Sequence, residues 1–327
     1  MKLFVGCDLG GTNIKAGLVN VEDGQVLISK SIPTLARQGP EAVLKRMAKL
    51  ISDLINAGQI DKSDIGGLGI SAPGMIDLET NTTQFLPNLF SGWKDVPVGE
   101  RMTSYLDLEV AMLNDVRAIT FGEWAFGAGK GVDSMACFAI GTGVGGGLVV
   151  NNQLVLGFGG TAGELGHQTV ERNGPLCGCG NYGCIEVFAS GPAIAGEAAR
   201  GVRQGWATKI VDLIDHDLNQ LTPEIVSQAA RMGDELALEV WERAGTYLGI
   251  GIANILTCVG VKRVVIAGGV SKAGDLLLDP IKREVKKRVF LMPIEKVEII
   301  QAQLGNDAGT VGMAAWSAVQ QGYEIIN

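Results

Sequence analysis

A histidine and three cysteines lie close together near the middle of the chain: His167, Cys177, Cys179 and Cys184. Three thiolates and one imidazole suit tetrahedral Zn²⁺, and four protein ligands leave no open position for catalysis. Glycines between the cysteines allow a tight loop around an ion. The spacing therefore predicts a structural zinc site, with buried free cysteines or a disulfide as the alternatives.

Two glycine turns are candidates for phosphate binding. Asp8-Leu-Gly10-Gly11-Thr12 and Ile140-Gly141-Thr142-Gly143 each lie between two apolar runs. Backbone N–H groups and threonine hydroxyls in such turns bind phosphate oxygens. Gly141 to Gly146 also satisfies the G-x-G-x-x-G string, but strand sequence follows where the dinucleotide fingerprint requires a helix. The two matched turns favour phosphate binding, with ordinary hairpin turns as the alternative.

Two aspartates stand at the ends of predicted strands. Asp8 is placed to hold Mg²⁺ through water, the usual arrangement for this strongly hydrated ion. Asp115 follows the apolar run Val110–Leu113 and precedes a predicted helix. It is therefore a candidate general base or a helix N-cap.

Strands and helices alternate around these groups, which predicts an α/β fold. We expect strands at Leu3–Cys7, Ile14–Val19, Ile65–Ser71, Val110–Leu113, within Ala136–Val150, at Lys262–Ala267 and at Val297–Gln301. We expect helices at Pro40–Ala57, Val116–Phe126, Pro192–Arg203, Glu224–Arg231, Asp234–Leu256, Asp275–Lys287 and from Asp307. The repeated strand–turn–strand pattern points to an internal duplication.

We expect two domains, although no linker divides the chain. Residues 1–115 would form a small α/β domain, joined by the C-terminal helix 305–327, and residues 116–304 a larger one. The candidate phosphate-binding turns and Asp115 would meet at the cleft between the two domains.

The composition excludes several classes of protein. The chain has 327 residues, 46% of them hydrophobic, and a net charge of −8, which argues against nucleic-acid binding. No signal peptide or membrane span is visible, so we expect a reducing cytoplasm, where thiolate–metal chemistry is favoured over disulfides. Cys7, Cys137 and Cys258 lie in apolar runs and are predicted to be core residues.

Together these motifs resemble the ROK family of sugar kinases and related repressors, in the actin-like ATPase superfamily. Within that family the pattern is most similar to the bacterial glucokinases. The matching residues are Asp8-x-Gly10-Gly11-Thr12, Pro73-Gly74, Pro87-Asn88-Leu89 with Trp93, Asn114-Asp115, Gly141 to Gly147, Gly163-Glu164-x-Gly166-His167, Cys177 to Glu186 and Gly268-Gly269-Val270.

The resemblance implies a role for each matching residue. Asp115 would be the catalytic base, and the turns around Asp8 and Thr142, with Gly268 and Gly269, would bind ATP. The sugar would be held by Asn88, Asn114, Asp115, Glu164, His167 and Glu186, and zinc by His167, Cys177, Cys179 and Cys184. One departure is Arg117, where the family more often has asparagine.

The implied activity is ATP-dependent phosphorylation of a hexose at its 6-hydroxyl, with glucose as the expected substrate. ATP, Mg²⁺ and structural Zn²⁺ would be its cofactors, and self-association, as a homodimer or larger, is expected. The alternatives are a kinase for N-acetylmannosamine, N-acetylglucosamine or another hexose, and a non-catalytic sugar sensor related to the repressors. The repressors carry an N-terminal helix-turn-helix domain, whereas the Asp-x-Gly-Gly-Thr strand begins here at Leu3.

Overall fold

The computed structural model describes residues 2–86, 89 and 92–325, and their contacts divide the chain into two compact units. The first comprises Met1–Asp133, Leu148–Gly163 and Gln303–Asn327, and the second Ser134–Gly147 and Glu164–Ala302. The chain therefore passes from one unit to the other after residues 133, 147, 163 and 302.

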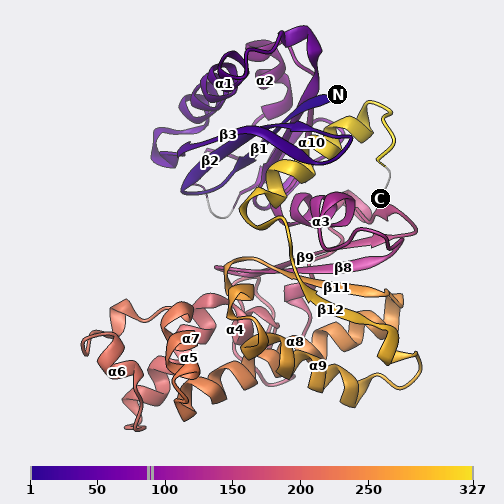
Figure 1. Cartoon of the computed structure of the whole chain (residues 1–327). Coiled ribbons are helices and arrows are strands. Elements are labelled where there is room, and N and C mark those ends of the chain that lie inside the picture. The colour runs from indigo at the N-terminus through magenta and orange to yellow at the C-terminus, as the bar shows by residue number, and fades with distance from the viewer. Residues whose placement is uncertain (1, 87–88, 90–91, 326–327) are drawn as a thin grey trace. The chain divides into compact units, whose positions relative to one another are not determined.

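The first unit is built on a five-stranded sheet with strand order β3-β2-β1-β4-β7 (Figure 1). β1 (Leu3–Leu9), β2 (Asn13–Asn20) and β3 (Gln25–Pro33) are antiparallel neighbours, whereas β4 (Ile65–Ala72) and β7 (Val110–Asn114) run parallel to β1. The carboxyl ends of parallel strands meet at one edge of a sheet. Asp8, Ser71 and Asn114 therefore gather at that edge.

Helices cover both faces of this sheet. α1 (Pro40–Ala57) and α2 (Val98–Leu106) lie on one face, and α10 (Ala308–Gln320) lies on the other, where α3 (Asp115–Phe126) packs against it (Figure 1). α1 begins with a proline at its first position, which suits a helix start. Its buried residues follow the helical period and face the sheet: Val43, Leu44, Met47, Ile51 and Leu54.

Two strand glycines let α10 approach the sheet closely. A Cβ at Gly6 would lie 1.8 Å from the Thr310 carbonyl oxygen, and one at Gly69 would lie 2.0 Å from the Met313 carbonyl oxygen. Any larger side chain would displace the helix from the sheet. A two-stranded hairpin, β5 (Met75–Asp77) with β6 (Thr82–Phe85), also belongs to this unit.

The second sheet has strand order β10-β9-β8-β11-β12. Its strands are β8 (Met135–Ile140), β9 (Val144–Val150), β10 (Gln153–Leu154), β11 (Arg263–Ala267) and β12 (Glu298–Gln301). β8, β11 and β12 are parallel, so the turns at Gly141 and Gly268 leave the same edge of the sheet.

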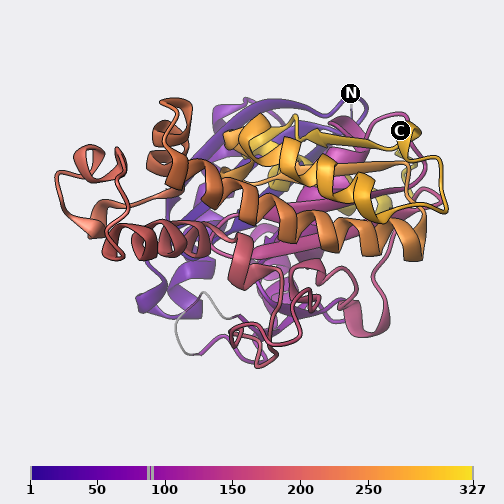
Figure 2. The ribbon, with the colours of Figure 1, turned by 90° about the horizontal axis from the view of Figure 1, so that it is seen from below.

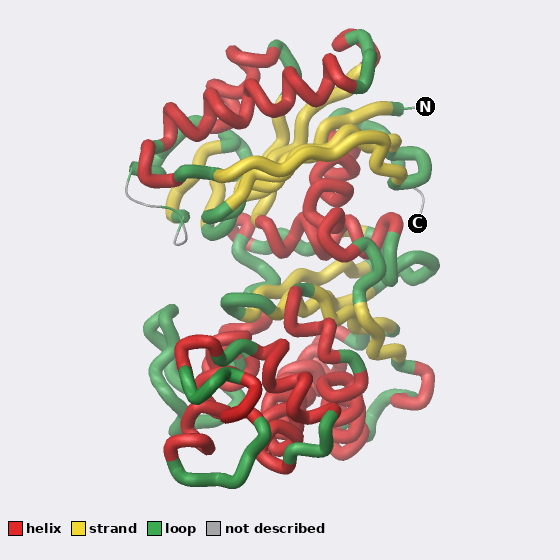
Figure 3. Tube along the Cα trace, turned by 60° about the vertical axis from the view of Figure 1, so that its left-hand side comes forward, coloured by secondary structure: helices red, strands yellow, loops and turns green. Residues whose placement is uncertain are grey.

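The second unit also contains a group of helices (Figure 3). They are α4 (Glu186–Ala189), α5 (Gly191–Arg203), α6 (Ile210–Leu213), α7 (Pro223–Arg231), α8 (Glu235–Val259) and α9 (Asp275–Arg288). The long α8 and α9 lie side by side (Figure 2). Among the described residues, no helix is long and apolar enough to cross a membrane.

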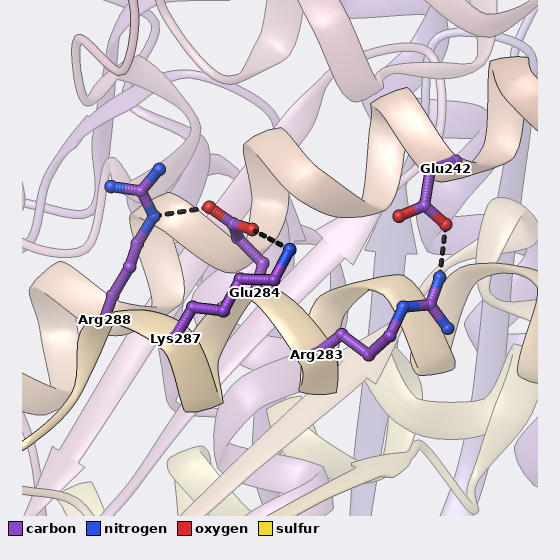
Figure 4. Close-up of polar contacts among 5 residues, drawn as sticks. All are labelled: Glu242, Arg283, Glu284, Lys287 and Arg288. Atoms are coloured by element: carbon purple, nitrogen blue, oxygen red, sulfur yellow. Dashed lines mark hydrogen bonds and ion pairs between the residues drawn. The ribbon is translucent and has the colours of Figure 1, made fainter.

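Ion pairs form along α8 and α9 (Figure 4). Arg283 pairs with Glu242 across the two helices. Within α9, Glu284 accepts from Arg288 Nε at 2.5 Å and from Lys287 Nζ at 3.5 Å. The Arg283–Glu242 pair is exposed on both sides, and such pairs contribute about 0–1 kcal/mol each, so we expect the packing of α8 on α9 to depend mainly on apolar contacts.

Every helix and strand predicted from the sequence is present, apart from shifts at its ends, but β3, β5, β6, β10, α2, α4 and α6 were not predicted. The helix predicted at Pro40–Ala57 has those bounds, and α8 extends past the predicted end at Leu256 to Gly260, which caps it with φ 71°. Contacts group residues 116–133 with the first unit, because α3 packs along α10. The prediction that Cys258 is a core residue is wrong: Cys7 and Cys137 are buried, but the last turn of α8 is exposed.

Candidate active site

Asn114 and Asp115 lie at the start of α3, and their hydrogen bonds show which of them caps the helix. The Asn114 side-chain oxygen accepts from the N–H groups of Val116 at 3.0 Å and Arg117 at 3.3 Å, so Asn114 is the N-cap. Its amide nitrogen donates to the Gly74 carbonyl at 3.2 Å. One Asp115 carboxylate oxygen accepts from Val116 N–H at 2.9 Å. Capping therefore does not depend on Asp115.

The second carboxylate at this sheet edge is Asp8. Its Oδ1 accepts a 2.6 Å hydrogen bond from the hydroxyl of Ser71, the neighbouring residue on β4. Burial raises the pKa of Asp8, while the Ser71 hydroxyl and the charge of Lys15 lower it. Lys15 in turn forms a 2.7 Å ion pair with Asp307, just before α10.

The position of Asp115 changes its acidity. Burial and the nearby charge of Asp8 raise its pKa to about 6, although Val116 N–H and Arg117 act in the opposite direction. An aspartate in water has a pKa near 3.9. A carboxyl group shifted toward neutrality can accept a proton at physiological pH and release it again.

The turn between β1 and β2 is held by hydrogen bonds from Thr34, the residue that follows β3. Thr34 donates its N–H to the Thr12 carbonyl at 2.8 Å and its hydroxyl to the Gly10 carbonyl at 2.7 Å. Because these bonds use carbonyl oxygens, the turn keeps its shape while the Thr12 side chain stays exposed. This geometry suits a turn that receives a ligand.

The turn between β8 and β9 is held by Glu186. Glu186 Oε2 accepts from Val144 N–H at 3.0 Å, and a Cβ at Gly143 would lie 2.5 Å from that oxygen. The other oxygen, Oε1, lies 3.5 Å from Cys177 Sγ. One carboxylate thus connects the glycine turn to the cysteine cluster.

The histidine and the three cysteines come together as predicted. Their donor atoms all lie within 4.8 Å of one another, with Cys177 Sγ 3.6 Å from His167 Nδ1 and Cys179 Sγ 3.7 Å from Cys184 Sγ. Four ligands about 2.3 Å from a tetrahedral Zn²⁺ would be about 3.8 Å apart, so the donor set fits this ion. The cysteines are free, and the 3.7 Å separation is too long for a disulfide.

The segment that carries Glu164 and His167 packs against β9. Leu165 and Gly166 are buried, and a Cβ at Gly166 would lie 1.8 Å from the Val144 carbonyl oxygen. Glu164 is exposed, at the start of this turn. Close packing on β9 fixes the backbone between the carboxylate and the imidazole.

A cavity of about 340 Å³ in the second unit joins two of the predicted nucleotide elements. Gly141 and Thr142 line one part of it, and Gly269 another. Its walls also include residues that the sequence analysis did not select: Gly191, Pro192, Ala195, Leu221, Thr222, Pro223, Glu224 and Val270. Pro192 and Pro223 each occupy the first turn of a helix, a local signal that predicts the helix but not the cavity.

The predicted site residues form two sets, one in each unit. Asp8, Gly10, Gly11, Thr12, Asn114 and Asp115 belong to the first, and Gly141, Thr142, Gly143, Glu164, His167, Cys177, Cys179, Cys184, Glu186, Gly268 and Gly269 to the second. Asn88 lies outside the described residues. Ser71 was missed, because its contact with Asp8 joins residues 63 positions apart.

Comparisons with known proteins identify the family. The profile of the ROK family matches residues 4–320. This chain belongs to the ROK family. A glucokinase from Halalkalibacterium halodurans is 36% identical over 320 residues, which cover 97% of this chain and 95% of the relative.

Relatives within the ROK family differ in their activities. The xylose repressor of Bacillus subtilis is 31% identical over 95% of this chain and 76% of its own length. A solved ROK glucokinase from Streptomyces griseus, in complex with glucose and AMPPNP, is 32% identical, with a TM-score of 0.81 over 98% of this chain and all of that one. The mixed α/β fold with two sheets is therefore the fold of the ROK sugar kinases.

Proposed function

We propose that this ROK-family chain transfers the γ-phosphoryl group of ATP to the 6-hydroxyl of glucose. Relatives named glucokinase align with nearly its whole length, and one was solved with glucose and an ATP analogue. The observation that carries the proposal is the Asp115 carboxylate. It lies at the edge of the sheet, is relieved of capping by Asn114, and has its pKa raised to about 6.

Asp115 would act as the general base. It would take the proton of the 6-hydroxyl while that oxygen bonds to the γ-phosphorus and the bond from phosphorus to the bridging oxygen of ADP breaks. Such proton transfer contributes about 10²–10⁴-fold to a rate. Positioning and electrostatics supply most of the remaining acceleration in phosphoryl transfer.

The two glycine turns would bind the phosphates of ATP. Thr12 and Thr142 are exposed on turns whose backbone groups already bond to the protein, through Thr34 at the first turn and Gly191 at the second. Asp8 would hold Mg²⁺, and that ion would neutralise charge on the phosphates. Adenosine would enter the cavity next to Gly268 and Gly269.

Sugar hydroxyls both donate and accept hydrogen bonds, so a sugar pocket needs carboxylates and amides. We assign this role to Asn88, Asn114, Glu164, His167 and Glu186. Asn114 Nδ2 bonds Gly74, which fixes the plane of its amide. Glucose would therefore be held by residues of both units.

Zinc would be structural and would be held by His167, Cys177, Cys179 and Cys184. Burial raises the pKa of the Cys177 thiol to about 12 in the absence of an ion, and a bound cation would favour the thiolate instead. The ion would fix the loop that ends at Glu186, so that this carboxylate keeps its contact with the turn at Gly143.

Three further features belong to this proposal. The two units would close on the substrates to exclude water, as sugar kinases must do to avoid hydrolysing ATP. The two sheets with their matched turns would derive from an internal duplication. The chain would self-associate, as a homodimer or a larger homo-oligomer.

A coupled assay of ADP formation tests the function directly. The purified chain is incubated with Mg·ATP and with glucose, mannose, fructose, N-acetylglucosamine or N-acetylmannosamine. We expect the highest kcat/KM with glucose. Activity mainly on an acetylated sugar would contradict the substrate but not the reaction. Sugar binding without turnover would favour a sensor, the second candidate, which the similarity to xylose repressors supports.

A further inference from the structure

Arg117 is a buried arginine in the first turn of α3, two residues after Asp115. Its exposed fraction is 2%. Burying a guanidinium group is unfavourable unless it has well-placed partners. Its Nε donates a 2.7 Å hydrogen bond to the Ala162 carbonyl oxygen, 45 residues along the chain. An arginine held this way connects two parts of the backbone.

The segment that Arg117 holds needs such an anchor. Residues 157–163 include four glycines with positive φ: Gly157, Gly159, Gly160 and Gly163. Glycine loses more conformational freedom than other residues when it is fixed. Phe158 in the same segment is 98% exposed, so its side chain contributes little packing. The segment has local bonds, such as Ala162 N–H to the Leu156 carbonyl at 2.9 Å, but its four glycines and exposed phenylalanine leave part of its restraint to residues elsewhere in the chain.

This segment leads directly to Glu164. Ala162 stands two residues before Glu164, and the chain leaves the first unit after Gly163. Arg117 stands two residues after Asp115. A single side chain thus joins the helix that begins with one proposed site residue to the backbone that precedes another.

We propose that Arg117 is a positioning residue for phosphoryl transfer, which fixes the segment before Glu164 to the helix that begins at Asp115. The inference rests on the proposed function, because it assumes that both carboxylates act on the same sugar. An uncharged, shorter residue such as asparagine would provide neither the charge nor the reach of this arginine. The arginine therefore gives this chain a restraint that does not follow from the shared motifs.

The charge of Arg117 supports this role. Burial and Asp8 raise the pKa of Asp115, while Val116 N–H and the Arg117 guanidinium lower it. Loss of the charge should therefore move the acidic limb of the rate profile to higher pH. A purely structural arginine elsewhere in the fold would not cause that shift.

The test uses Arg117→Met and Arg117→Lys, with Arg283→Met as the matched control. Arg283 pairs with Glu242 on the surface of α9 (Figure 4), outside the proposed site. For Arg117→Met we expect kcat/KM for glucose to fall about 10- to 100-fold, with KM for ATP changed by less than about twofold. Lysine keeps the charge and one donor, so Arg117→Lys should recover part of the loss. Arg283→Met should behave as the unmodified chain.

Hydrogen exchange gives a readout that does not depend on activity. In Arg117→Met, exchange across residues 157–163 should accelerate, whereas exchange in α9 should not. Unchanged exchange there, or equal losses for glucose and ATP, would overturn the proposal. If Arg117→Met does not fold, Arg117→Lys decides by the same two measurements. If the unmodified chain phosphorylates no sugar, the proposed function fails, and the exchange data still show whether Arg117 holds the segment.

Discussion

At the scale of single residues, two neighbouring side chains at the start of α3 have different roles: Asn114 caps the helix, and Asp115 is the candidate base. Asn114 accepts from the first N–H groups of the helix, and Asp115 contributes only its Oδ1, which accepts from Val116 N–H. Two adjacent polar residues would look interchangeable in a sequence. Their hydrogen bonds show that the chain can lose the charge of Asp115 without losing the helix.

Replacing Asp115 with asparagine should therefore abolish most turnover while the fold remains. We expect kcat to fall about 10²–10⁴-fold, with KM for glucose changed much less, since the amide still forms hydrogen bonds. Steady-state kinetics and circular dichroism of the variant measure the two effects. Near-normal turnover in Asp115→Asn would remove Asp115 as the base.

The raised pKa of Asp115 also predicts a pH dependence. A base acts when it is ionised, so activity should be complete above about pH 7 and fall as the pH drops through the pKa of about 6. The pKa of Asp8 is raised as well, so the apparent pKa measured on the acidic side of the profile belongs to the pair Asp8 and Asp115, not to Asp115 alone. A profile of kcat/KM for glucose that stays flat down to pH 5 would contradict the raised pKa.

At the scale of elements, the loop from Cys177 to Glu186 is expected to depend on its metal. Removing zinc by chelation, or Cys184→Ser, should weaken glucose binding about tenfold or more, because the loop would lose the ion that fixes it; mutating the groups that support metal ligands typically costs about 10–100-fold in metal affinity or activity. Calorimetric titration with glucose and elemental analysis for zinc measure both properties. Cys258→Ser, at an exposed cysteine outside the cluster, is the control. Equal glucose affinity with and without the metal would rule out this role.

The contact of α10 with the first sheet predicts a sharp effect of one methyl group. Gly69→Ala would place Cβ 2.0 Å from the Met313 carbonyl, so α10 must shift, at a cost of about 1–3 kcal/mol or more. Gly196→Ala, at an exposed position of α5 with open space, should instead stabilise the chain by up to about 1 kcal/mol. Thermal unfolding of both variants measures the difference. Equal melting temperatures would show that α10 is not tightly packed.

Local patterns predicted most of the elements, although they did not give β3 or α2, and long-range contacts account for the site contacts that were missed. Pro40 and the apolar period predict α1 to the residue, since both signals lie within the helix itself. The cysteine cluster was predictable because three ligands lie within eight residues. The Arg117–Ala162 and Ser71–Asp8 contacts join distant residues, so no local signal reports them. The assigned roles of the site residues stay predictions until variants are measured.

At the scale of the whole molecule, the proposed assignment of glucose-binding residues to both units predicts that the bound ligands bring those units closer together. We expect small-angle scattering to show a smaller radius of gyration when glucose and a non-hydrolysable ATP analogue are both present. Glucose with Asp115→Asn serves as a control that binds without turnover. An unchanged radius under saturating ligands would contradict closure.

The path of the chain has a consequence for how the protein is made. α10 covers β1 and β4, yet it follows the entire second unit in sequence. On the ribosome, the strands that carry Gly6 and Gly69 emerge early, while the helix that shields them emerges hundreds of residues later. During that interval one apolar face of the nascent sheet lacks its natural cover. The first unit is therefore begun before the second unit is made and completed only after it, so we expect this face to be exposed to other proteins while the second unit is being synthesised.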